Sequence, residues 1–167
     1  LQIIAYLSEH SFDTSHSLIV VPKTLLENWK REFLKFAPEI KVYIYHGRDR
    51  CIEEFQNHQV IITTYGTLIN DFDRLNSHYF ENMIIDEAQY IKNARSKAYR
   101  AVKYIQARTK IIMTGTPIEN NIQEYWNLMR IANPTMMSFK EISKGLEPDQ
   151  IVSRVRFLTT PFLLRRL

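Results

Sequence analysis

Five short apolar runs, rich in β-branched residues, restrict the fold of this chain more than any other feature. They are SLIVV (17–21), KVYIYH (41–46), QVIITT (59–64), NMIID (82–86) and KIIMT (110–114). The runs lack the polar alternation of a strand with one solvated face, so they predict strands that are buried on both sides. Segments of helical period separate them. The sequence therefore predicts an α/β fold, doubly wound, with a mainly parallel sheet and helices on both faces.

Three segments outside these runs show helical spacing. Leu25, Trp29 and Phe33 fall on one face of the segment that follows VPK, which favours core packing for Trp29. A second helix is predicted before the last run, where apolar residues recur at i, i+3, i+4 and i+7: Ala98, Ala101, Val102 and Ile105. Asn121 can cap a third helix, with Glu124 as its third residue.

The pattern changes from about Asn133 onward, where the chain is helical in tone and interrupted by Pro134, Pro148 and Pro161. We expect residues 1–132 to form one lobe and residues 133–167 to form a helical appendage packed on the sheet.

The composition limits the class of protein. With 167 residues, of which 45% are hydrophobic and only four are glycine, the chain has the size and apolar share of one globular domain. No apolar run approaches the roughly 20 residues that cross a bilayer, so we expect no membrane partner. We expect an intracellular location, in the cytoplasm or nucleoid of a prokaryote or in the nucleus of a eukaryote. The single cysteine, Cys51, excludes an internal disulfide.

The net charge of +4 permits a polyanionic partner. The positive charge is concentrated between residues 92 and 110, where no acidic residue occurs. The basic residues of this block are Lys92, Arg95, Lys97, Arg100, Lys103, Arg108 and Lys110. Such a block is either a solvated helix face or a surface that contacts phosphates, and both interpretations stay open.

Chemistry is expected where the predicted strands end, because ligands of open α/β sheets bind at the carboxyl ends of the strands. Asp86 and Glu87 directly follow an apolar run. In nucleotide-hydrolysing folds a carboxylate at this position holds Mg²⁺, and a neighbouring one orients or deprotonates the attacking water. The alternative is that Asp86 caps the following helix and Glu87 is solvated.

Five strings occur in the order VVPKTLLENWKREF, ITTYGTL, DEAQYIKN, TGTPIENN and PFLLRRL. Together they resemble the Swi/Snf family of helicase-like ATPases that translocate on double-stranded DNA, and the resemblance covers nearly the whole chain. Arg165 and Arg166 in the last string favour this family over the DEAD-box RNA helicases. The resemblance implies a RecA-like lobe of the P-loop NTPase type. It also implies ATP and Mg²⁺ as cofactors, and double-stranded DNA, DNA-bound proteins and a second RecA-like lobe as partners.

The same resemblance assigns roles to individual residues. Asp86 is the Mg²⁺-coordinating residue and Glu87 the water-activating residue of the Walker B segment DEAQ, whose Gln89 is a further catalytic candidate. Thr114, Gly115 and Thr116 match a motif that couples the nucleotide state to DNA movement, although a plain strand-to-helix turn would use the same residue types. The DNA-binding candidates are Pro22, Lys23, Thr24, Thr63, Thr64, Tyr65, Lys92, Asn93 and Arg95.

One departure from the family pattern concerns phosphate binding, because no Gly-x-x-x-x-Gly-Lys-Ser/Thr string occurs in the chain. The first residues, LQIIAYL, resemble the helix that follows this loop, so we expect the chain to begin just after its P-loop and to end before a second lobe. We therefore expect an ATP hydrolase in the intact protein and negligible activity in the isolated chain.

Two other classes stay open. One is a related motor, such as an RNA helicase or a restriction-system translocase. The other is a non-catalytic scaffold that binds nucleic acid.

Overall fold

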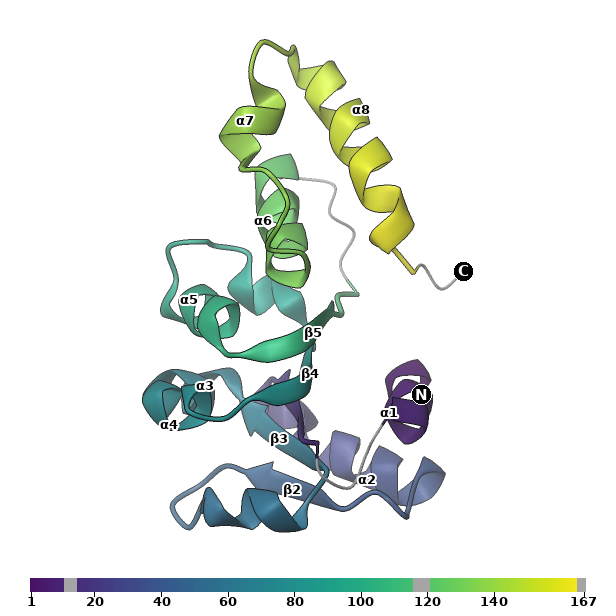
Figure 1. Cartoon of the computed structure of the whole chain (residues 1–167), viewed down its shortest axis with the longest axis vertical. Helices are drawn as coiled ribbons and strands as arrows, with labels where there is room; N and C mark the ends of the chain where they lie inside the picture. Colours follow the sequence, from purple (N-terminus) through teal and green to yellow (C-terminus); the bar gives the residue numbers. More distant parts are fainter. Residues whose placement is uncertain (11–14, 116–120, 165–167) are drawn as a thin grey trace.

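The structure, a computed structural model, describes residues 1–10, 15–115 and 121–164. Within them, one sheet has the strand order β2-β3-β1-β4-β5 (Figure 1), and every neighbouring pair is parallel. Its strands are β1 (Ser17–Val21), β2 (Val42–Tyr45), β3 (Val60–Thr64), β4 (Phe80–Ile85) and β5 (Ala107–Ile112). The predicted α/β class and parallel sheet are confirmed.

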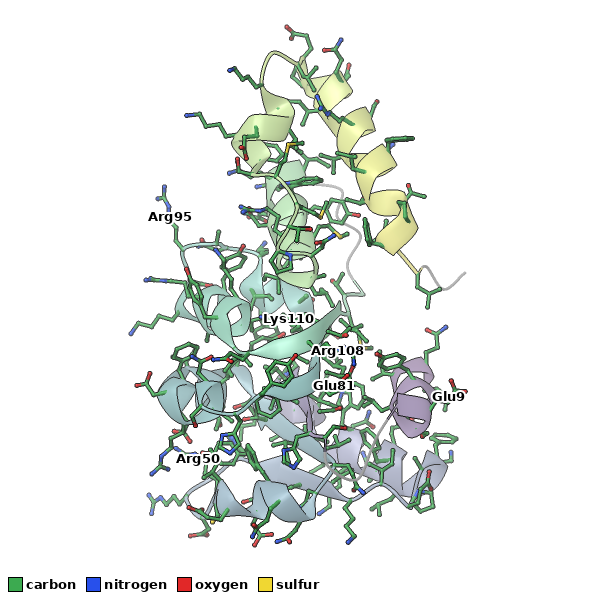
Figure 2. The ribbon with its side chains drawn as sticks, viewed as in Figure 1. Glu9, Arg50, Glu81, Arg95, Arg108 and Lys110 are labelled. Carbon is green, nitrogen blue, oxygen red and sulfur yellow. The ribbon has the colours of Figure 1, made fainter. Side chains whose placement is uncertain are left out.

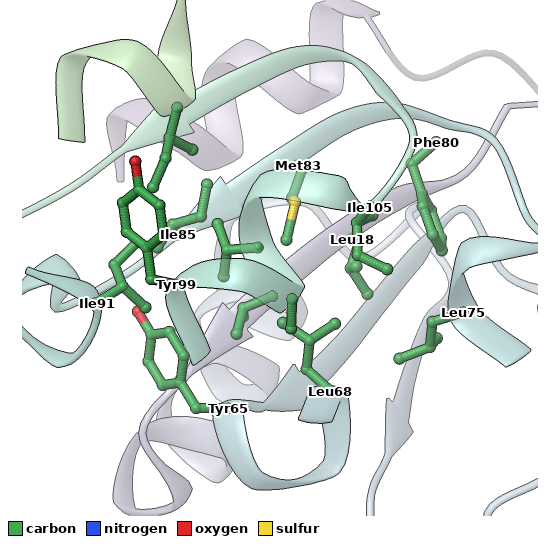
Figure 3. Close-up of a cluster of buried hydrophobic side chains, with 14 of the residues drawn as sticks. Leu18, Tyr65, Leu68, Leu75, Phe80, Met83, Ile85, Ile91, Tyr99 and Ile105 are labelled. Carbon is green, nitrogen blue, oxygen red and sulfur yellow. The ribbon is translucent and has the colours of Figure 1, made fainter. Parts of the chain in front are cut away.

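Helices cover both faces of this sheet (Figure 1). The first face packs against α1 (Gln2–His10) and α2 (Leu26–Phe36), and the second against α3 (Tyr65–Asn70), α4 (Phe72–Asn76) and α5 (Lys97–Tyr104). Leu18 and Val20 of β1 join the core of the second face, part of which Figure 3 shows, whereas Ile19 and Val21 join the core of the first. Both faces of the strand are therefore apolar, which explains the missing alternation in the sequence.

Short 3₁₀ helices complete the connections. They are η1 (Lys23–Leu25), η2 (Glu53–Asn57), η3 (Ala88–Ile91) and η4 (Thr160–Phe162). No helix among the described residues is long and apolar enough to cross a membrane.

The predicted helical faces are confirmed for α2 and α5. Trp29 and Phe33 lie buried on the sheet side of α2. The Ser96 hydroxyl caps α5 by accepting from the Tyr99 N–H group. At the other end of α5, the Lys110 ammonium (labelled in Figure 2) donates to the carbonyl oxygens of Val102 and Lys103, at 2.8 and 2.7 Å. Burial lowers the pKa of Lys110 to about 8.

The fifth strand differs from its prediction, since β5 covers residues 107–112 and not 110–114. Its first half, Ala107 to Thr109, pairs with β4 but is partly polar. Polar side chains are tolerated there because β5 is an edge strand of the described sheet and is only partly buried.

The loop after β2 is fixed by an ion pair. Arg50 (labelled in Figure 2) donates from Nε and Nη2 to the two carboxylate oxygens of Asp71, at 2.5 and 2.8 Å. Tyr45 donates to the same carboxylate at 2.8 Å, and Asp71 is only 9% exposed. The hydrogen bonds from Arg50 hold the pKa of Asp71 below its ordinary value.

Three helices follow the sheet, and the last two pack on the first one and not on the sheet, which corrects our expectation of an appendage packed on the sheet. They are α6 (Ile122–Ala132), α7 (Phe139–Ser143) and α8 (Pro148–Thr159). Leu128 of α6 faces the main core, whereas Trp126 on another side of α6 forms a separate cluster with Ile142 and Val155. The sequence pattern showed apolar residues on α6 but not that they divide between two cores.

Candidate active site and nucleic-acid interface

The carboxyl ends of the strands meet along one edge, as predicted. Val21 lies beside Thr64 in the β1–β3 register, and Ile85 lies beside Ile112 in the β4–β5 register. The residues that follow these four positions therefore share that edge. Asp86 is among them, at the end of β4 next to the central strand β1.

The Asp86 carboxylate is held at both oxygens. Its Oδ1 accepts from the N–H group of Glu87 at 2.9 Å, and its Oδ2 accepts from the indole Nε1–H group of Trp29 at 2.9 Å. Its backbone oxygen accepts from the hydroxyl of Tyr65 at 2.5 Å. Asp86 is not the N-cap of η3, since Glu87 occupies that position. The capping alternative for Asp86 therefore fails.

Glu87 has a left-handed backbone, with φ 52° and ψ 55°, and it is the only such non-glycine residue in the described part of the chain. This conformation costs a residue with a Cβ about 1–2 kcal/mol. It turns the chain sharply directly after the strand. Left-handed non-glycine residues concentrate at functional sites, which makes Glu87 a candidate on backbone geometry alone.

Hydrogen bonds connect Glu87 with the end of the neighbouring strand. The side-chain Nε2 of Gln89 donates to Oε2 of Glu87 at 2.7 Å. The hydroxyl of Thr114, just beyond β5, donates to Oε1 of Gln89 at 3.5 Å, the long end of hydrogen-bond range. Three residues to which the family resemblance assigned catalysis or coupling are therefore connected by two successive hydrogen bonds.

Tyr65 supports Asp86 from the second face of the sheet. It is 7% exposed, and its ring stacks on that of Tyr90 with centroids 5.3 Å apart. Burial, followed by the negative charges of Asp86 and Glu87, raises the pKa of the Tyr65 phenol well above its ordinary value. The phenol therefore stays protonated and keeps donating to the Asp86 carbonyl.

The predicted DNA-binding residues divide into an exposed and a buried set. Lys23 and Thr24 are exposed beyond β1, and Pro22 is half-buried. Lys92, Asn93 and Arg95 are all exposed beyond η3, and Figure 2 shows Arg95 pointing away from the protein. One Lys92 contact is with Glu124 of α6, 4.0 Å away. The exposed set therefore presents two cationic segments to solvent.

The buried set comprises Thr63, Thr64 and Tyr65. The Thr63 hydroxyl is fully buried and donates to the Tyr45 carbonyl at 2.9 Å. Thr64 caps α3 by accepting from the Thr67 N–H group at 3.1 Å. The side chains of all three residues therefore have internal partners in this structure, and a DNA contact through them stays a prediction.

Two parts of the prediction lie outside the described residues, namely Thr116 and the pair Arg165 and Arg166. Gly115 is described and exposed.

The sequence did not predict the role of Trp29 beyond core packing. It is 8% exposed, as expected, but its N–H group also reaches a carboxylate 57 positions further along the chain. The residue type could have indicated a polar partner, because a buried indole N–H group usually has a hydrogen-bond acceptor.

Asp86 fits the chemistry of a Mg²⁺ ligand. Each of its oxygens accepts one of the hydrogen bonds described above and has capacity left for a second partner. Mg²⁺ typically binds through one or two carboxylates together with waters and substrate phosphates. No cluster of three or more His, Cys, Asp or Glu side chains within the described residues could hold a metal by itself. A Mg²⁺ ion held by Asp86 would therefore need further ligands, such as water or substrate phosphates.

Comparison with known proteins identifies relatives of this chain. The sequence model of the SNF2-related domain matches residues 1–167. The chain is 32% identical to the ISWI chromatin-remodeling complex ATPase ISW2 of Saccharomyces cerevisiae, with 90% of this chain and 15% of the relative covered. It is 40% identical to the DNA excision repair protein ERCC-6-like of Bos taurus, with 99% of this chain and 16% of the relative covered. It thus spans only a small part of these relatives.

A solved structure has the same fold. The SWI2/SNF2 ATPase core of Sulfolobus solfataricus in complex with double-stranded DNA superposes with a TM-score of 0.83 at 32% identity, covering 98% of this chain and 36% of that chain. The fold is therefore the RecA-like fold of a SWI2/SNF2 ATPase core. The family match, the relatives and the superposition together show that this chain belongs to the SNF2-related family of Swi/Snf ATPases.

Proposed function

We propose that this chain is part of an ATP-dependent motor that translocates on double-stranded DNA and remodels DNA-bound protein complexes. Residues 1–132 supply most of one RecA-like lobe, and residues 133–167 an appendage leading towards the second lobe. The observation that carries the proposal is the contact chain from Thr114 through Gln89 to Glu87, beside a carboxylate held in a fixed orientation. This arrangement suits a site in which a change at Glu87, after β4, is transmitted through Gln89 to Thr114, after β5.

The residues have distinct roles in this proposal. Asp86 would hold Mg²⁺ together with ATP phosphates, and the ion would supply positive charge to offset the negative charge that develops on the phosphoryl group. Glu87 orients the attacking water and accepts its proton, and Gln89 fixes the Glu87 carboxylate through the 2.7 Å hydrogen bond. Thr114, Gly115 and Thr116 transmit the nucleotide state to DNA movement.

DNA binding is proposed for the exposed segments at the carboxyl edge. Pro22, Lys23 and Thr24 would grip one strand, and Lys92, Asn93 and Arg95 would contribute further phosphate contacts. Backbone groups near Thr63, Thr64 and Tyr65 would complete the surface, since the side chains there are buried. Contacts of this kind position a protein on DNA without reading sequence.

The test is ATP hydrolysis by the intact protein with and without double-stranded DNA, alongside a Glu87→Gln variant. We expect strong DNA stimulation in the wild type and its loss in the variant, because an amide cannot accept the proton of water. Glu39→Gln, a change at an exposed position before β2, is the matched control. A wild-type protein that binds DNA without hydrolysing ATP would support a scaffold role, and stimulation by RNA in place of DNA would support an RNA helicase.

The isolated chain is expected to hydrolyse ATP negligibly and to bind DNA weakly. Rapid turnover by these 167 residues alone would contradict the proposed need for a P-loop and a second lobe.

A further inference from the structure

We propose that Trp29 is a positioning residue for the metal-binding carboxylate, in addition to its place in the hydrophobic core. This inference rests on the proposed function of Asp86. The Nε1–H group of Trp29 lies 2.9 Å from Oδ2 of Asp86 and is the only polar group of its side chain. The other oxygen, Oδ1, accepts from the backbone of Glu87 at 2.9 Å. Two donors on opposite oxygens fix the plane of the carboxylate.

The rigidity of the donor makes this contact effective. Trp29 is 8% exposed in the core that α2 forms with the sheet, and its ring packs near Phe33 with centroids 6.1 Å apart. A long polar side chain in the same place would lose conformational entropy on ordering, whereas packing already orders this ring. Packing in the core therefore holds the indole N–H group in position to donate to Asp86.

The chemistry of the donor also matters. An indole N–H group donates but cannot accept, and it carries no charge. It can hold a carboxylate without neutralising it, unlike a lysine or arginine, which would compete with Mg²⁺ for the same negative charge. Asp86 therefore stays available to a cation while its orientation is restricted. Partners that orient a metal ligand in this way typically change metal affinity by 10–100-fold when they are removed.

The helix that carries Trp29 directly follows a segment that is proposed to bind DNA. Trp29 lies on α2, whose first residue, Leu26, follows directly after η1 and the proposed DNA-binding segment Pro22–Thr24. The helix that carries the donor is therefore continuous with a segment expected to contact a DNA strand.

The experiment compares Trp29→Phe with Trp126→Phe in the intact protein. Both changes remove one indole N–H group that donates at 2.9 Å, but Trp126 donates to the Met137 carbonyl in the cluster of α6 to α8. Binding of a fluorescent ADP analogue is titrated with Mg²⁺. We expect the Mg²⁺ concentration at half-saturation to rise about tenfold in Trp29→Phe and to stay unchanged in Trp126→Phe. Nucleotide binding without Mg²⁺ should be the same in all three proteins.

A double-mutant cycle separates positioning from simple loss of packing. If Trp29 acts through Asp86, the Trp29→Phe change should have no further effect on the Mg²⁺ requirement in an Asp86→Asn background. If wild-type protein binds nucleotide in a Mg²⁺-dependent way and Trp29→Phe has the same Mg²⁺ requirement, this inference alone is overturned. Wild-type protein without Mg²⁺-dependent binding would overturn the proposed function as well. If Trp29→Phe does not fold, an isosteric analogue with sulfur in place of the indole N–H group at position 29 makes the same comparison.

Discussion

Replacing Gln89 by glutamate should slow ATP hydrolysis while leaving the fold intact. The change keeps an acceptor for the Thr114 hydroxyl but replaces the amide that donates to Oε2 of Glu87 at 2.7 Å. It also places a second negative charge beside the Glu87 carboxylate. The catalytic carboxylate therefore loses its orienting partner and gains a repelling one.

The size of the effect follows from the contact that is lost. A hydrogen bond to a charged group contributes about 1.5–3 kcal/mol. Gln89 and Glu87 are only half-buried, so solvent weakens the interaction and about 1–2 kcal/mol is a better value for this pair. If that contribution is realised only in the transition state, kcat falls roughly 5- to 30-fold, since about 1.4 kcal/mol corresponds to a factor of ten.

The assay is steady-state ATP hydrolysis by the intact protein at saturating double-stranded DNA, with kcat and KM determined separately. Gln106→Glu is the control, because it adds the same charge at an exposed position immediately before β5. That position lies at the amino end of the strand, away from the carboxyl ends where Glu87 and Gln89 lie. We expect a reduced kcat and a similar KM for Gln89→Glu. A kcat within a factor of two of the control would refute the idea that Gln89 orients Glu87.

Two further predictions concern stability and pH. Asp71 has a lowered pKa because of Arg50, so the pair stabilises the fold above the ordinary carboxyl pKa and this stability is lost as the pH falls through the lowered value. Urea denaturation midpoints of Arg50→Met should therefore be lower than those of wild type at pH 7 and should converge with them as the pH falls through the lowered pKa of Asp71. Arg48→Met, at an exposed neighbouring position, should match wild type throughout. Burial lowers the pKa of Lys110 to about 8 in the folded protein. Between pH 8 and the ordinary lysine pKa, the unfolded chain therefore binds more protons than the folded chain, and the stability of the fold rises with pH. This rise in melting temperature should be flatter in Lys110→Met than in Lys103→Met, and equal slopes would contradict the assignment.

The sequence predicted the elements whose signals are local. Apolar β-branched runs gave the strands, helical spacing gave the buried faces of α2 and α5, and Asn121 caps α6 as expected. The place of Asp86 at a strand end also followed from the sequence, because parallel strands bring their carboxyl ends to one edge.

The contacts that define the site depend on pairs of residues far apart in the chain, and no local pattern contains them. The hydrogen bond from Trp29 to Asp86 requires the register of α2 on the sheet. The left-handed backbone of Glu87 was not predictable from residue type, since glutamate rarely adopts it. The burial of Thr63 likewise reflects strands on both sides of β3 and not its own polarity.

The two tryptophans of the chain lie in separate cores, so the intrinsic fluorescence of each can report on its own core. Indole emission depends on the charge and solvent around the ring. In the Trp126→Phe protein, the remaining indole of this chain touches the Asp86 carboxylate, so its emission would follow the arrival of a cation at that carboxylate. In the Trp29→Phe protein, the remaining indole lies between α6 and the C-terminal helices and would follow their movement. Two variants of the 167-residue chain, each with one indole, would thus report separately on the Asp86 carboxylate and on the C-terminal helices, without an attached dye.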